Sequence, residues 1–156
     1  MRVTFGDAWY SNPGAALRPV QLRQVHDAKQ SLILSGKPVD PPRVVANLSL
    51  GFWVGLFGPK YETSLWRNHL RWIFDRAPTP LRRRAVHERL DRIRMLRNRV
   101  AHYEPVLHLP LAQEFRAILE LIAWLCFATS VHTARRSQLE AVLQNRPTAR
   151  DPVATA

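Results

Sequence analysis

The sequence predicts an all-α protein of five to six helices, with an up-down bundle as the simplest arrangement. Apolar residues recur at intervals of three and four along most of the 156 residues, the spacing of one face of a helix. Prolines and glycines fall between these periodic segments, where helices begin and end. No segment shows a convincing strand pattern, so we expect helices joined by short loops.

The first half of the chain is expected to contain an irregular start and two helices. Residues 1–18 carry several glycines and prolines and should lack regular structure. Residues 19–35 are expected to form a helix that stops at Gly36. A second helix should open at Pro41 or Pro42 and end before Gly58-Pro59, with its inward stripe formed by Val44, Val45, Leu48, Phe52 and Leu56.

The next two helices flank Thr79. Residues 60–76 are expected to be helical up to Ala77-Pro78, with Tyr61, Leu65, Trp66, His69, Leu70 and Ile73 or Phe74 on one side. Thr79 should cap a helix over residues 80–103, with Pro80 at its first position and Pro105 as its stop. Its core stripe is predicted to be Leu81, Val86, Leu90, Ile93, Leu96 and Val100.

The last part of the chain should hold a long apolar helix over residues 111–136 and a short one near residues 137–143. The inward side chains of the long helix are predicted to be Phe115, Ile118, Leu119, Ile122 and Leu125. The expected organisation is therefore an irregular segment at 1–18, one helical domain at 19–144 and a flexible tail at 145–156.

Positive charge points to an anionic partner. The net charge is +11, and only Lys29, Lys37 and Lys60 among the 23 cations are lysines. From Arg67 to Arg99 there are eleven arginines and three acids, a balance of +8. A guanidinium can bind phosphate through two hydrogen bonds, so the charge favours a nucleic-acid partner. An acidic protein partner would also fit it, and so would an arginine-rich composition that only reflects the base composition of the genome.

Several classes of site and location are not expected. Cys126 is the only cysteine, which excludes an intramolecular disulfide and a cysteine-based zinc site, and its apolar surroundings predict a buried side chain. The six histidines are scattered without metal-ligand spacing, so we expect no metal and no cofactor. Apolar runs are too short to span a bilayer and no signal peptide is evident, so the expectation is a cytoplasmic protein without membrane contact.

The segment "RMLRNRVAHYEPV", residues 94–106, holds a candidate site. Asn98 and His102 are four apart and share a helix face. Arg97 precedes His102 by five residues, about 140° around the axis and roughly 7.5 Å along it, yet a long side chain can still reach that surface. An imidazole can move a proton of an RNA 2′-hydroxyl, and a guanidinium can stabilise charge on the phosphate. The alternative is a basic helix end that favours the dipole.

Further arginines are candidates for contacts with RNA. Arg94 extends the face of Asn98, and Arg99 lies in the last turn of the same helix. Arg82, Arg83 and Arg84 open that helix and form either a solvated face or a track for the RNA backbone. The aromatic residues could stack bases but are more typical of a core or an interface, and this set is Phe52, Trp53, Phe57, Trp66 and Trp72.

"LRNRVAHYEP" resembles the signature of the HEPN superfamily of helical RNA-binding and RNA-cleaving domains, and residues 44–66 narrow the resemblance to its Abi-like (abortive infection) bacterial proteins. The resemblance implies a HEPN-like bundle, a homodimer with a composite site, and a metal-independent endoribonuclease. Arg97 and His102 would be the catalytic pair and Asn98 the positioning residue. The implied role is phage defence or a toxin with an antitoxin partner. The alternative is a catalytically inactive helical module that binds RNA or protein.

Overall fold

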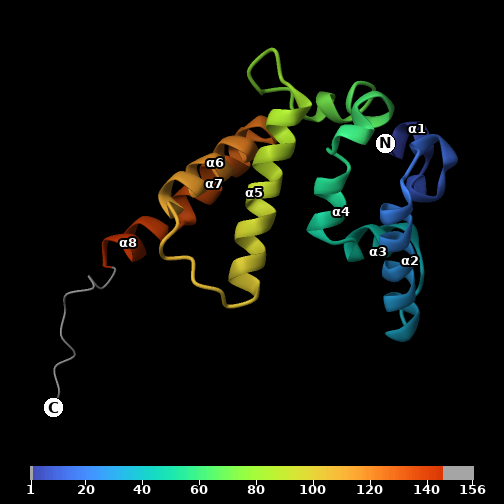
Figure 1. Cartoon of the computed structure of the whole chain (residues 1–156), viewed down its shortest axis with the longest axis horizontal. Coiled ribbons are helices and arrows are strands. Elements are labelled where there is room, and N and C mark those ends of the chain that lie inside the picture. The colour runs from blue at the N-terminus through green and yellow to red at the C-terminus, as the bar shows by residue number, and fades with distance from the viewer. Residues whose placement is uncertain (1, 146–156) are drawn as a thin grey trace.

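The chain folds into helices that form two groups side by side (Figure 1). The computed structural model describes residues 2–145, and no strand occurs within that range. The first group is made by the helices before residue 56, which are α1 (Arg2–Phe5), α2 (Pro19–Leu34), α3 (Pro41–Asn47) and α4 (Leu50–Gly55). The second group is made by α5 (Arg83–Ala101), α6 (Leu111–Leu125), α7 (Phe127–Arg136) and α8 (Leu139–Gln144). The all-α prediction is confirmed.

Short turns of 3-10 and π helix complete the fold. Two lie between α1 and α2, namely η1 (Trp9–Ser11) and η2 (Pro13–Ala15). Three lead from α4 toward α5, namely η3 (Pro59–Tyr61), the π turn η4 (Glu62–Trp66) and η5 (Leu70–Ile73). These turns carry the chain from the first group of helices to the second (Figure 1).

The core lies where the first group meets the start of α5. Its most buried side chains come from α3, α4, η4 and α5, and they are Val44, Phe52, Leu56, Leu65 and Val86. Edge-to-face aromatic pairs extend the core toward α6, where Phe74 lies 6.5 Å from Trp124 between ring centroids. The inward stripes predicted for residues 41–57 and 60–76 are confirmed in large part, because most of their members are buried.

Two predicted helices are each divided in two. The helix expected over residues 41–57 breaks at Leu48, because the Ser49 hydroxyl accepts a hydrogen bond from the Phe52 amide at 3.2 Å and caps α4. The helix expected over 111–136 breaks at Cys126, which has an extended backbone. The Ser130 hydroxyl donates to the Leu119 carbonyl at 2.9 Å. One straight helix would hold those residues about 16 Å apart, so α7 must fold back along α6.

Two other boundaries differ from the prediction. Residues 60–76 are not one α-helix but the turns η3 to η5, although the predicted apolar side still faces the core. The helix predicted to open at Pro80 begins at Arg83, and the Thr79–Pro80 bond is cis. Thr79 therefore does not cap it, and Arg82 at the cap position makes no side-chain cap bond. The predictions for α2, which ends before Gly36, and for a short helix near 137–143 are confirmed.

Three side chains expected inside lie at the surface instead. Val100 and Leu125 are about half exposed because α5 and α6 present those positions away from the core, which ends near Val86 and Trp124. Cys126 is exposed because it occupies the turn between α6 and α7 rather than the middle of a helix. Asn145 follows α8, and residues 146–156 of the expected tail lie outside the described range.

Candidate active site at the end of α5

The predicted site lies in the last turn of α5 and the turn that follows it. The His102 amide donates to the Asn98 carbonyl at 2.9 Å, so His102 continues the helical bonding as the C-cap. Tyr103 then adopts a left-handed backbone with φ of 56°. The Tyr103 amide donates to the Val100 carbonyl and the Glu104 amide to the Arg99 carbonyl. This pattern of bonds is the Schellman turn, which fixes where His102 leaves the helix.

The three residues of the predicted catalytic set are all accessible at this end. His102 and Arg97 are exposed and Asn98 is half-buried. A guanidinium nitrogen of Arg97 donates to the Asn98 Oδ1 at 3.4 Å. No hydrogen bond joins Arg97 to His102 within residues 2–145, in keeping with their separation of about 140° around the helix. One chain therefore links the arginine to the Asn98 amide but leaves Arg97 without a hydrogen bond to the imidazole.

Arg99 gathers a second set of polar groups beside His102. Its Nε lies 4.0 Å from a carboxylate oxygen of Glu104, and one of its terminal nitrogens lies 3.4 Å from the His108 Nε2. Glu104 therefore lies at the outer limit of an ion pair with Arg99. His108 was not among the predicted site residues, since it lies in the loop before α6 and helical spacing says nothing about where a loop residue comes to rest.

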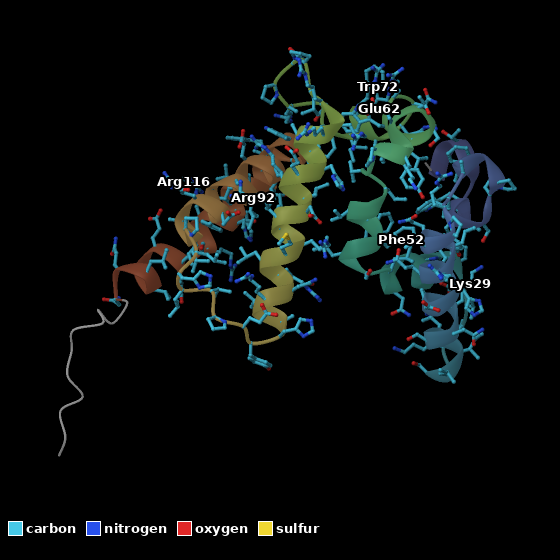
Figure 2. The ribbon with its side chains drawn as sticks, in the orientation of Figure 1. Lys29, Phe52, Glu62, Trp72, Arg92 and Arg116 are labelled. Atoms are coloured by element: carbon cyan, nitrogen blue, oxygen red, sulfur yellow. The ribbon has the colours of Figure 1, made fainter. Side chains whose placement is uncertain are left out.

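A small pocket adjoins this cluster between α5 and α6. Its volume is about 170 Å³ and it mixes apolar and charged side chains, namely Arg92, Met95, Leu96, Arg99, Leu109 and Glu114. Arg92, labelled in Figure 2, pairs with Glu114 across it. Arg99 is shared between the pocket and the polar cluster, so a ligand held by Arg99 can reach both.

Arg94 lies on the side of α5 that faces α4. Its Nε pairs with Asp91 at 2.7 Å, and its aliphatic stem passes Gly51 of α4. Its side chain is one third exposed. Of the arginines predicted to contact RNA near His102, Arg99 therefore has the more open surroundings.

The arginines at the start of α5 belong to a different place. From Arg83 to Ala101 the helix rises roughly 27 Å, so Arg82, Arg83 and Arg84 lie at the opposite end from His102. Arg83 is largely buried at 11% side-chain exposure, pairs with Glu62 at 2.7 Å and also donates to the Phe57 carbonyl. Arg84 is exposed and pairs with Glu88 in the next turn, while Arg82 is exposed. The fold thus holds Arg83 through its bonds to Glu62 and Phe57, whereas Arg82 and Arg84 lie at the surface.

The part of the chain that the structure describes has neither a metal-binding cluster nor a helix suited to span a membrane. No three histidine, cysteine, aspartate or glutamate side chains gather closely enough to hold a metal ion there. No helix between residues 2 and 145 combines the length and the apolar character needed to cross a membrane.

Compared with protein-family models, with curated proteins and with solved structures, the chain matches none of them. The resemblance of residues 96–105 to the HEPN signature therefore stays a hypothesis, and any function must be inferred from the geometry at the end of α5.

Proposed function

We propose that the chain is a metal-independent endoribonuclease of the Abi-like, HEPN type, with its site at the end of α5. The observation that carries the proposal is the open position of His102. Its backbone forms the C-cap of α5 while its side chain is exposed, and Arg97, Asn98 and Arg99 lie within the preceding turn and a half. A core histidine satisfied by its neighbours would be buried, whereas His102 is exposed.

The chemistry requires no group beyond the chain and the RNA. The His102 imidazole accepts the proton of a ribose 2′-hydroxyl, whose oxygen attacks the adjacent phosphorus. The bond from phosphorus to the 5′-oxygen breaks, and that oxygen leaves with a proton from solvent or from an imidazole. The products are a 2′,3′-cyclic phosphate and a free 5′-hydroxyl. Arg97 stabilises the negative charge that builds on the phosphate oxygens, and Asn98 holds that arginine in place.

A second copy of the chain would complete the site. Within one chain Arg97 and His102 project from different faces of α5, so a single phosphate is reached more easily by Arg97 of one subunit and His102 of another. Such contact is favoured by exposed apolar side chains near the site, namely Met95, Val100 and Leu107. Covering them with the same surface of a second copy would remove that area from water.

A cleavage assay tests the proposal. The wild type should cut a structured RNA in the presence of a metal chelator and leave 2′,3′-cyclic phosphate ends. His102→Ala and Arg97→Ala should each lose activity by at least about a hundredfold, the usual scale for a lost proton carrier or charge stabiliser. His26→Ala is the matched control, because it removes an exposed imidazole from α2 and should leave cleavage unchanged. Cleavage that survives both site variants would refute the assignment.

The implied biological role can be tested in cells. We propose phage defence or toxicity, with an antitoxin as a possible partner. Expression of the wild type should arrest growth, and expression of the His102→Ala chain at equal level should not. Equal growth in both cases would argue against a toxin.

A second candidate is a helical module that binds RNA without cutting it. The exposed Arg82 and Arg84, far from His102 along α5, favour this reading because they carry charge that the catalytic set does not need. Salt-sensitive RNA binding with no cleavage in the wild type would select this candidate.

A further inference from the structure

Trp72 exposes its indole ring in the segment that leads into α5 (Figure 2). The side chain is 64% exposed, whereas the other four tryptophans are buried or half-buried in the core, namely Trp9, Trp53, Trp66 and Trp124. Ile73 beside it is about half exposed as well. The structure thus separates Trp72 from the other aromatic residues that the sequence grouped together, and packing in the core does not account for it.

Arg71 stacks on this ring, with its guanidinium carbon 4.1 Å from the ring centroid. The fold uses the same kind of pair a second time, where Arg89 lies 4.5 Å from the ring of Trp124. There the indole is buried and Arg89 also pairs with Glu120, so that pair belongs to the packing. Arg71 has no carboxylate partner among the described residues, and both Arg71 and Trp72 are exposed to solvent.

The segment of sequence that carries Trp72 is strongly cationic. Residues 67–84 contain six arginines and one acid, Asp75. Glu62 pairs with both Arg67 and Arg83, so one carboxylate offsets two guanidinium groups. Arg76 and Arg82 are exposed, and within residues 2–145 no ion pair is found for either. An exposed aromatic ring with a guanidinium stacked on it, in a segment rich in arginine, matches the surfaces on which unpaired bases stack.

We propose that Trp72 and Arg71 form a platform for a base of single-stranded RNA, with Arg76 and Arg82 holding the adjoining phosphates. A base in a duplex has no free face, so the ligand must be unpaired at this position. An acidic protein would use the arginines but gain little from the ring, which is why RNA is favoured. The inference rests on RNA as the ligand of the proposed function, and not on cleavage, because the platform lies at the far end of α5 from His102.

Binding is measured in a cleavage-silent His102→Ala chain with a labelled single strand of about 16 nucleotides, the upper range for one binding module. Trp72→Leu should weaken binding by about fivefold or more, the loss expected for one base stacked on an aromatic ring. Trp72→Phe should retain most of the affinity because it keeps a ring. Arg135→Gln, an exposed arginine at the end of α7, is the control for loss of one charge and should change affinity little.

Fluorescence supplies a second readout. Trp72 is the exposed indole, so RNA should quench the long-wavelength emission, and Trp72→Phe should abolish that quenching. The platform is overturned if the wild type and Trp72→Leu bind RNA with equal affinity. It is also overturned if an acidic polypeptide displaces the RNA and quenches the Trp72 emission as strongly as RNA does. If binding depends on Trp72 but the wild type does not cleave RNA, the platform is supported and the nuclease proposal is overturned. If the wild type cleaves RNA but binding does not depend on Trp72, the nuclease proposal is supported and the platform is overturned. Failure to bind any single strand overturns the platform outright.

Discussion

At the scale of single residues, Tyr103 has a strained backbone conformation in the candidate site. Its φ of 56° is a region in which the Cβ of an L-residue is crowded, and glycine usually takes this position after a helix. Its side chain is 96% exposed, so packing does not compensate for the strain. The turn nevertheless forms, because the bonds from Tyr103 and Glu104 back to α5 satisfy two carbonyls of the helix end.

Tyr103→Gly should therefore stabilise the fold by about 1 kcal/mol, since it removes the strain and no buried contact. Urea unfolding followed by circular dichroism measures the change in the free energy of unfolding. Tyr103→Ala is the control, because it removes the ring but keeps the Cβ, and it should leave stability nearly unchanged. A fall in stability with glycine would mean that the tyrosine ring has a contact that this structure does not contain.

Cys126 should be a reactive thiol although it lies in an apolar stretch of sequence. The Thr129 hydroxyl and then the Thr129 amide hydrogen-bond its sulfur, and the Arg76 charge also favours the thiolate, so the pKa of Cys126 is lowered. The rate of alkylation by iodoacetamide should rise at a pH below the ordinary value of 9.0 for this group. Thr129→Val should shift that rise to higher pH. A profile centred at or above 9.0 in the wild type would contradict the geometry.

At the scale of elements, one hydroxyl joins the start of α2 to η3. The Tyr61 hydroxyl accepts from the Arg18 amide at 2.9 Å and donates to the Gln21 Oε1 at 2.9 Å. Tyr61 is 2% exposed and Gln21 is buried as well, and burial raises the pKa of the phenol. Removing the hydroxyl leaves a buried amide oxygen without its donor, which costs more than a typical hydrogen bond contributes.

Tyr61→Phe should accordingly destabilise the protein by about 1–3 kcal/mol. The measurement is again the free energy of unfolding in urea. Tyr103→Phe is the matched control, because it removes the same hydroxyl from an exposed position and should have little effect. An equal effect of the two substitutions would show that the link between α2 and η3 contributes nothing.

Helix boundaries were predictable where the signal was local. Pro19 and Gly36 set the ends of α2 as expected, because each restricts its own backbone. The breaks at Ser49 and Cys126 were not predictable from periodicity, since the apolar pattern continues through both. The first depends on the Ser49 cap, and the second on a hydrogen bond between Ser130 and Leu119 that exists only once α7 has folded back.

The candidate site was predictable in part for the same reason. Positions on α5 follow from the helical period, so the relation of Arg97, Asn98 and His102 is as expected. The different environments of Arg83 and its neighbours follow from Glu62, which is twenty-one positions away in sequence. The approach of His108 to Arg99 depends on the path of a loop, and the exposure of Trp72 depends on the irregular turns before α5. No periodic pattern encodes either.

At the scale of the whole molecule, α5 separates the two proposed functional surfaces. The proposed base platform around Trp72 and the proposed catalytic end around His102 are joined by α5, whose one fully buried side chain is Val86. Toward His102 the core gives way to exposed apolar side chains, including Met95 and Val100. A single chain thus leaves the proposed catalytic end of α5 partly uncovered, and the proposed second copy would cover it and bring Arg97 and His102 together.

Mixing two inactive variants tests this arrangement directly. If Arg97 of one subunit acts with His102 of the other, a dimer of one His102→Ala chain and one Arg97→Ala chain contains one intact site and one doubly defective site. Random exchange of subunits should then restore about a quarter of wild-type cleavage, because half of the dimers are mixed and half of their sites are whole. If each site lies within one chain, every site in the mixture carries a defect and activity stays absent. The wild type should also have a solution mass of about twice 18.0 kDa, and a monomeric mass together with full activity would exclude the shared site.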